Sequence, residues 1–200
     1  HASAAAVAVP ARAAEIARLR DALAEVLART DAGPVVATHG DLHEANLLVD
    51  DGALVGLLDV DALGPGHRVD DLACLLAHLS VLPALAPGTY RHVPGALRRW
   101  LAAVDDAGAA LDVDPVALRA RAGAVVLSLV AGSTGGGPEA EDGASRRLDV
   151  AGTWLAEARL RDLSSPRPRP LTNGDEAQTT ITQDTTTQGT TTQDTIQEDT

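Results

Sequence analysis

A short polar loop, set between apolar segments and followed only by helical patterns, constrains the fold of this chain most strongly. Val35–Thr38 is a short apolar segment that predicts a strand, and the polar loop follows it. Two further apolar segments, 46–49 and 53–58, flank Asp50-Asp51-Gly52, a sequence typical of a hairpin turn. After Gly64-Pro65-Gly66 the apolar spacing is helical. The sequence therefore predicts an α+β fold that is mainly helical and carries one small β-hairpin.

Five segments have the apolar spacing of amphipathic helices, with Arg, Asp and Glu between the apolar positions. Asp70 is expected to cap the helix that it begins, because Asp is a favoured N-cap residue. Asp114-Pro115 is a good start signal, since Pro suits the first helical position after an Asp cap. The predicted helices are residues 11–29, 70–82, 94–107, 115–131 and 144–163.

Composition divides the chain into a folded part and a polar end. Residues 1–163 contain the apolar patterns, residues 164–170 form a Pro/Arg linker, and residues 171–200 repeat Thr, Gln and Asp. The polar end holds six acidic and no basic residues, which is half of the net charge of −12. A segment with almost no apolar residues cannot offset the entropy lost on ordering, so we expect 171–200 to be disordered.

The composition also excludes several kinds of partner. An acidic chain does not favour a nucleic-acid backbone, and no segment reaches the roughly 20 apolar residues of a membrane span. The single Cys74 cannot form an internal disulfide, which fits the reducing cytoplasm, and its apolar neighbours indicate a buried structural thiol. We therefore expect a cytoplasmic protein without nucleic-acid or membrane partners. Because the chain begins with His1 rather than Met, we expect it to be processed or a fragment.

The residues with chemical potential lie where predicted strands begin or end. Asp41 follows a strand in a tight loop, where its carboxylate can face a cleft and accept a proton from a hydroxyl group. Asn46 offers a neutral amide oxygen and Asp59 a charged one, and Mg²⁺ prefers such sparse oxygen ligation, completed by water and phosphate. Because a hairpin joins Asn46 to Asp59, we expect both at the same end of two paired strands. A base beside metal ligands is typical of phosphoryl transfer.

Together these motifs resemble the aminoglycoside phosphotransferase and choline-kinase-like family. The resemblance rests on His39-Gly40-Asp41-Leu42-His43 with Asn46, on Leu57-Leu58-Asp59-Val60-Asp61, and on Gly66 with Asp71-Leu72-Ala73. It implies the C-terminal lobe of a protein-kinase-like fold, which uses Mg²⁺ to move the γ-phosphoryl group of ATP (or GTP) to a small-molecule alcohol. The resemblance also implies that the acceptor site is formed by the later helices and their acidic residues.

The resemblance assigns a role to individual residues of the motifs. The catalytic base is Asp41, and the magnesium ligands are Asn46 and Asp59. Asp71 is structural and hydrogen-bonds the catalytic loop, which His39 also supports. Asp61 lies where the family often has an acidic residue near the metal or the substrate.

The chain departs from the family's pattern in two places. His67-Arg68 stand where the family often has Asp-Pro after the glycine. More seriously, only 38 residues precede His39, their pattern is mainly helical, and the whole chain has no Lys to pair with ATP phosphates. We therefore expect the nucleotide-binding lobe to be missing from this chain, either lost or encoded as part of a longer enzyme. The alternative is a non-catalytic, pseudokinase-like lobe that binds a partner or ligand.

Two other interpretations of the motifs are weaker. The run His39-x-Asp41-x-His43 is similar to a zinc motif, but no further His/Cys cluster in the sequence completes it. The remaining central histidines, His67, His78 and His92, show no ligand-like spacing.

Asp59-x-Asp61 after an apolar strand also resembles the opening motif of haloacid-dehalogenase-like phosphatases, in which the first Asp is a nucleophile. That family has Thr or Val where Leu63 stands, and it alternates strands and helices after the motif. This chain continues with helical patterns alone, which favours the phosphotransferase interpretation.

Overall fold

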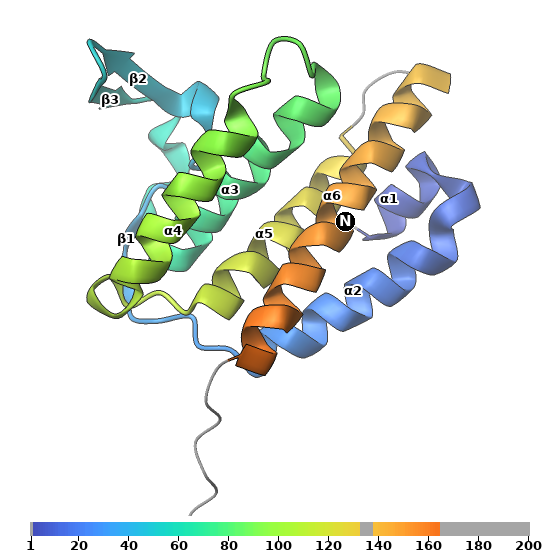
Figure 1. Ribbon diagram of the computed structural model, residues 1–200, viewed down its shortest axis with the longest axis horizontal. Helices are drawn as coiled ribbons and strands as arrows, with labels where there is room; N and C mark the ends of the chain where they lie inside the picture. Colours follow the sequence, from blue (N-terminus) through green and yellow to red (C-terminus); the bar gives the residue numbers. More distant parts are fainter. Residues whose placement is uncertain (1, 133–137, 165–200) are drawn as a thin grey trace, which may run out of the picture. The chain divides into compact units, whose positions relative to one another are not determined.

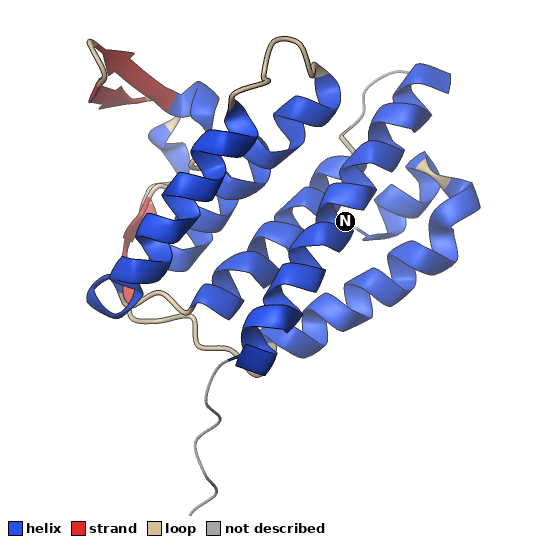
Figure 2. Ribbon diagram, in the orientation of Figure 1, coloured by secondary structure: helices blue, strands red, loops and turns tan. Residues whose placement is uncertain are grey.

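The computed structural model describes residues 2–132 and 138–164. Within these residues the fold is mainly helical with two small antiparallel sheets, which confirms the predicted α+β class (Figures 1 and 2). The helices are α1 (Ala2–Ala8), α2 (Ala13–Leu27), α3 (Arg68–Leu85), α4 (Val93–Leu111), α5 (Pro115–Val130) and α6 (Pro138–Ser164). The strands are β1 (Val35–Thr38), β2 (Leu47–Asp50), β3 (Ala53–Leu57) and β4 (Gly64–His67), with single 3₁₀ turns η1 (Pro10–Arg12), η2 (Glu44–Asn46) and η3 (Val60–Ala62).

Helix α5 is the centre of the helical core and packs against α1, α2, α3 and α6. Because the chain has no Phe and no Met, the core consists largely of Ala, Val and Leu side chains, which need closely approaching helices to fill space. Gly123 permits such an approach. A Cβ added there would lie 3.0 Å from the Leu23 side chain of α2 and 3.3 Å from the Trp154 side chain of α6.

The predicted hairpin is present as β2 and β3, in which Leu47 lies opposite Leu57. Asp51 and Gly52 have φ angles of 46° and 76°. Two successive positive φ angles are characteristic of the tight turn that an Asp-Gly pair favours between antiparallel strands. The hairpin projects beyond the ends of the helices (Figure 2).

Strand β4 was not predicted, because its sequence of Gly, Pro, Gly and His gives no strand pattern. It pairs with β1, so that Thr38 lies opposite Gly64 and Val35 opposite His67. Pro is tolerated in an edge strand, and both strands of a two-stranded sheet are edge strands. The pairing brings the residues before the polar loop next to those that lead into α3.

Local signals predicted some helix starts and missed others. Asp114 caps α5 as predicted, because its carboxylate accepts hydrogen bonds of 2.7 and 3.3 Å from two backbone N–H groups of the first turn. The prediction that Asp70 caps its helix was wrong. Helix α3 begins at Arg68, so Asp70 lies inside the first turn and pairs with Arg121 of α5 instead. Helix α1 was not predicted, and α6 begins six residues earlier than expected, at Pro138.

The boundary predicted after residue 163 lies at the end of α6, which continues through Ser164. The rest of the predicted linker and the Thr/Gln/Asp-rich segment 171–200 lie outside the described residues. In residues 2–132 and 138–164, none of the helices combines the length and the apolarity that a bilayer crossing requires.

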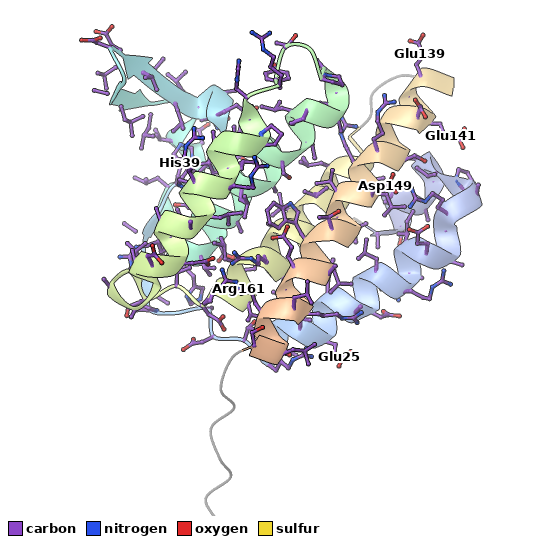
Figure 3. All side chains as sticks on the ribbon, viewed as in Figure 1. Glu25, His39, Glu139, Glu141, Asp149 and Arg161 are labelled. Carbon is purple, nitrogen blue, oxygen red and sulfur yellow. The ribbon has the colours of Figure 1, made fainter. Side chains whose placement is uncertain are left out.

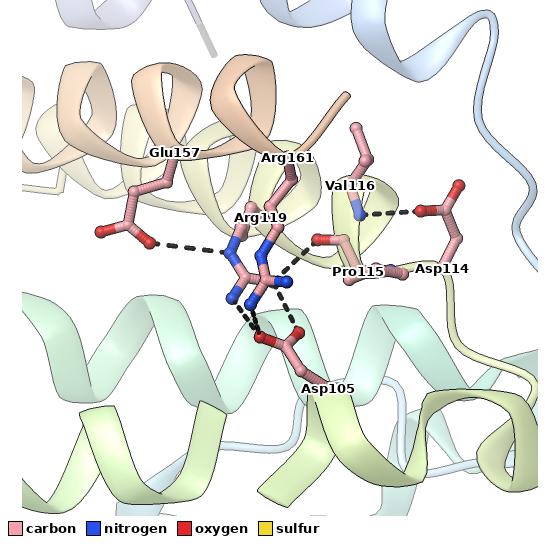
Figure 4. A network of polar contacts seen from close by, with 7 residues as sticks. All are labelled: Asp105, Asp114, Pro115, Val116, Arg119, Glu157 and Arg161. Atoms are coloured by element: carbon pink, nitrogen blue, oxygen red, sulfur yellow. Dashed lines mark hydrogen bonds and ion pairs between the residues drawn. The ribbon is translucent and has the colours of Figure 1, made fainter. Parts of the chain in front are cut away.

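An ion network centred on the buried Arg119 joins α4, α5 and α6 (Figure 4). Arg119 of α5 is 4% exposed, and its guanidinium donates to both carboxylate oxygens of Asp105 in α4, at 2.9 and 2.8 Å. Arg119 also donates to the carbonyl oxygen of Pro115 at 3.0 Å and lies 3.6 Å from the Glu157 carboxylate of α6. Arg161 of α6 binds the same Asp105 carboxylate. Bidentate arginine contacts of this kind are geometrically specific, so the network fixes how the three helices meet.

We expect Arg119→Met to lower the free energy of unfolding by about 1.5–3 kcal/mol, because the largely buried Asp105 carboxylate loses its bidentate partner and keeps Arg161. Urea unfolding of the full chain measures this loss. The matched control is Arg20→Met, which removes an exposed pair with Asp21 and should cost less than about 1 kcal/mol. Similar losses in the two variants would contradict a special role for the network.

Candidate functional site

The polar loop of residues 39–46 connects β1 to β2 and lies against α3, which contacts both β1 and η2. His39 is 4% exposed, whereas half of the Asp41 side chain is exposed. The loop therefore begins in the interior of the fold and presents the Asp41 carboxylate partly to solvent.

Asp71, in the first turn of α3, holds the start of this loop. Its Oδ2 accepts a hydrogen bond from the backbone N–H of His39 at 2.8 Å, and its Oδ1 accepts one from the N–H of Gly40 at 2.9 Å. These are the hydrogen bonds that the family resemblance implies for Asp71. Because the acceptor is a carboxylate, both bonds are of the stronger, charge-assisted kind. The loop and the first turn of α3 are thereby joined directly.

The ring of His39 joins the loop to the hairpin. Its Nδ1 accepts a hydrogen bond from the backbone N–H of Asp41 at 3.3 Å, and its Nε2 lies 2.8 Å from the carbonyl oxygen of Leu58. Since Nδ1 accepts, the hydrogen of the neutral ring is on Nε2, which donates to Leu58. The backbone N–H of Leu58 in turn donates to the carbonyl oxygen of Asn46 at 2.9 Å. The residue before Asp59 is thus bound to both ends of the loop.

The two predicted metal ligands lie at the same end of the hairpin. Asn46 directly precedes β2, and Asp59 follows β3 by two residues. The Asn46 side-chain amide donates to the carbonyl oxygen of Asp41 at 3.0 Å, so the amide oxygen is the atom of Asn46 that can bind a metal. Asp59 is exposed and has a φ of 52°, a left-handed conformation that turns the chain from the strand into η3. A carboxylate and an amide oxygen form a donor set that fits Mg²⁺.

Gly40 brings the loop into close contact with η3, the turn that contains Asp61. Gly40 has a φ of 84°, and a Cβ added there would lie 2.7 Å from the carbonyl oxygen of Ala62. Only glycine fits this position without displacing the backbone. Asp61 is exposed on the segment that the loop touches. The structure therefore places Asp61 on the same side of the fold as the loop.

Two residues that were not predicted to belong to the site, Cys74 and His78, lie beside the loop. The Cys74 Sγ is 3.8 Å from Oδ1 of Asp41, and the His78 ring stacks on His43 with 4.5 Å between ring centroids. Burial and the nearby Asp41 carboxylate raise the pKa of Cys74 to about 12, so its thiol stays protonated at neutral pH. Burial lowers the pKa of His78, which keeps its ring neutral at neutral pH.

The signal that could have found these two residues is their spacing from Asp71. Residues three, four and seven positions apart lie on one face of a helix. Asp71, Cys74 and His78 have this spacing, and all three contact the loop. One face of α3 is therefore the surface on which the loop is assembled.

The two residues that depart from the family's pattern fasten the start of α3. The Nδ1 of His67 lies 2.9 Å from the carbonyl oxygen of Gly33, and the guanidinium of Arg68 binds the carbonyl oxygen of Leu111 at the end of α4. His67 and Arg68 thus make structural contacts at the two positions where the family often has Asp-Pro.

Acidic side chains of α6 lie elsewhere. Figure 3 shows His39 on the side of the hairpin, whereas Glu139 and Glu141 lie near the start of α6, and Asp149 lies farther along the same helix. These three carboxylates do not border the loop around Asp41.

Comparison with known proteins points to one family. A sequence model described as the phosphotransferase enzyme family (APH) matches residues 1–104, which include the loop, the hairpin, α3 and much of α4. An uncharacterized protein of Deinococcus radiodurans is 57% identical over 37 residues, which are 18% of this chain and 11% of that protein. The match therefore covers a small part of that relative's length. No solved structure matches the chain.

We expect Asp71→Ala to destabilise the fold more than Asp70→Ala. Without the carboxylate, the buried N–H of His39 loses its acceptor at a cost of roughly 1–3 kcal/mol. The exposed N–H of Gly40 can instead donate a hydrogen bond to water. Asp70 is exposed and pairs with Arg121, a contact worth at most about 1 kcal/mol. Thermal or urea unfolding of the two variants measures the difference. Equal stability, or a larger loss for Asp70→Ala, would mean that other contacts hold the loop.

Proposed function

The chain belongs to the phosphotransferase enzyme family, and from this premise we propose that it is the catalytic, C-terminal lobe of a small-molecule kinase. It would move the γ-phosphoryl group of ATP (or GTP) to a hydroxyl group of a small alcohol. The observation that carries the proposal is the loop of residues 39–46, which carries Asp41 and Asn46 and is hydrogen-bonded at both ends to Leu58, the residue before Asp59. Phosphoryl transfer needs such positioned groups more than it needs covalent chemistry from the protein.

Asp41 is proposed as the catalytic base. Its backbone is held on both sides, because its N–H donates to the His39 ring and its carbonyl oxygen accepts from the Asn46 amide. Its carboxylate is half-exposed and can meet an acceptor hydroxyl. A base fixed in this way contributes roughly 10²–10⁴-fold to the rate, provided that the hydroxyl lies within hydrogen-bonding distance.

Asn46 and Asp59 are proposed to hold Mg²⁺. When bound, the ion neutralises charge on the nucleotide phosphates. The protein's own contribution is to fix one neutral and one charged oxygen at the base of the hairpin, through the strand pairing of β2 with β3. Asp61 is proposed to contact the metal or the substrate from η3.

We further propose that a nucleotide-binding part outside this chain completes the cleft. The hairpin and the residues that follow it expose large apolar side chains, with exposed fractions between 43% and 63%. Apolar surface of this extent is typical of an interaction site. The chain also has no Lys to pair with nucleotide phosphates. The exposed residues are Leu48, Val49, Leu54, Val55, Leu57, Leu58, Val60 and Leu63.

The exposed apolar side chains and the absence of Lys also favour the second candidate, a non-catalytic lobe that uses this apolar surface to bind a partner. The two functions differ in what they require of Asp41, because only the enzyme needs its carboxylate. In either case we propose that the protein acts in the cytoplasm, where its single Cys74 stays reduced.

We expect Asp41→Asn to lower the turnover number by roughly 10²–10⁴-fold while leaving the unfolding midpoint nearly unchanged, because the amide keeps the shape but cannot accept the proton. The measurement is Mg²⁺-dependent ADP release with a panel of aminoglycosides, choline and sugars, in the longest natural form of the protein. The matched control is Asp106→Asn, an exposed carboxylate on α4. Activity of Asp41→Asn within a few-fold of an active parent would refute the role assigned to Asp41, whereas a parent without activity would favour the non-catalytic candidate.

A further inference from the structure

Metal-binding types of side chain converge between the loop and α3. Asp41, Cys74 and His78 each offer one ligand atom, and the three atoms lie within 4.8 Å of one another. His43 and Glu44 form a second such group with the same His78. From the sequence, a zinc site was not expected, because no further His/Cys cluster completes His39-x-Asp41-x-His43. The structure supplies that cluster from α3.

The donor set of the first group differs from that of the proposed magnesium site. Zn²⁺ is bound by thiolate, imidazole and carboxylate at about 2.0–2.3 Å in tetrahedral sites, so their ligand atoms lie roughly 3–4 Å apart. The Cys74 Sγ and the Asp41 Oδ1 are already 3.8 Å apart. Soft sulfur and imidazole ligands select zinc-like ions, whereas Mg²⁺ prefers oxygen.

Two buried polar atoms at this place are unpaired. Among residues 2–132 and 138–164, the Nδ1 of His43 and the Oε2 of Glu44 are buried without a hydrogen-bond partner. Buried polar atoms without a partner are uncommon, and a bound ion is one way in which such atoms are satisfied. Both residues belong to the second group, which shares His78 with the first. The His43 Nε2 also lies 3.8 Å from Oδ2 of Asp41.

The two ligands from α3 stand on a rigid element. Cys74 and His78 are four residues apart and therefore neighbours on one helix face. Asp71 precedes Cys74 by one turn and ties the loop to the same face. Cys74 is only partly buried, which leaves an approach for an ion. Ligands on a helix are better preorganised than ligands on loops.

We propose that Asp41, Cys74 and His78 bind one ion of the zinc type, with His43 or Glu44 as the fourth ligand. The occupied site withdraws the Asp41 carboxylate from any hydroxyl substrate. A zinc-like ion therefore inhibits phosphoryl transfer, a consequence that rests on the proposed function. The binding itself does not depend on it.

Cobalt titration of the full chain tests the binding directly, because Co²⁺ takes zinc sites and its thiolate complexes absorb in the near ultraviolet. Cys74 is the chain's one Cys, so a thiolate–cobalt band reports on this residue alone. We expect one Co²⁺ per chain, displaced by Zn²⁺ and unaffected by excess Mg²⁺. Cys74→Ser should abolish the band, and His78→Gln should weaken Co²⁺ binding by roughly 10–100-fold or more.

The matched control is His92→Gln, which changes an exposed histidine directly before α4 and should leave Co²⁺ binding unchanged. Far-UV circular dichroism checks that each variant is folded. Absence of a thiolate–cobalt band in the parent chain, or equal affinity of the parent and a folded His78→Gln variant, would overturn the proposal. Because the spectrum requires no turnover, the metal site stands or falls independently of the proposed function, which only failure of phosphate transfer by the longest natural form would refute.

Discussion

The carboxylate of Asp71 accepts hydrogen bonds from the backbone N–H groups of His39 and Gly40, and the geometry of the site follows from this contact. It fixes the first residues of the polar loop on the first turn of α3. The His39 ring, held in this position, reaches Leu58 beyond the hairpin and supports the backbone of Asp41. Loop, hairpin and helix are therefore one hydrogen-bonded unit, in which a disturbance at Asp71 reaches Asp41 through the buried His39.

This unit is positioned by the core below it. Helix α3 packs on α5, and α5 packs on α6 through the small residue Gly123 and the ion network of Arg119. A core of Ala, Val and Leu needs such close contacts, because it has no large aromatic side chains except Trp to fill space. The hairpin lacks equivalent cover and exposes apolar side chains. The structure thus combines a well-packed helical core with a hairpin whose apolar side chains are exposed.

Local patterns predicted the hairpin and the Asp114 cap, because turn and cap residues act within a few positions of themselves. The resemblance predicted the hydrogen bonds of Asp71. Strand β4 was missed because pairing with β1, rather than composition, makes Gly64–His67 a strand. Cys74 and His78 were missed for a related reason. They contact the loop because α3 packs against it, and the sequence of the loop itself does not reveal that packing. The roles of Asp41, Asn46, Asp59 and Asp61 remain predictions.

The central claim is that the base of the hairpin holds a divalent cation between Asn46 and Asp59, next to Asp41. Titration of the ¹⁵N-labelled chain with Mn²⁺ tests it most directly, because this paramagnetic substitute for Mg²⁺ broadens amide signals near its binding site even when binding is weak. We expect selective broadening of residues 41–46 and 58–61, reversed by Mg²⁺ and lost in Asp59→Asn. Broadening centred on the acidic start of α6, at Glu139 and Glu141, or broadening unchanged in Asp59→Asn, would contradict the account.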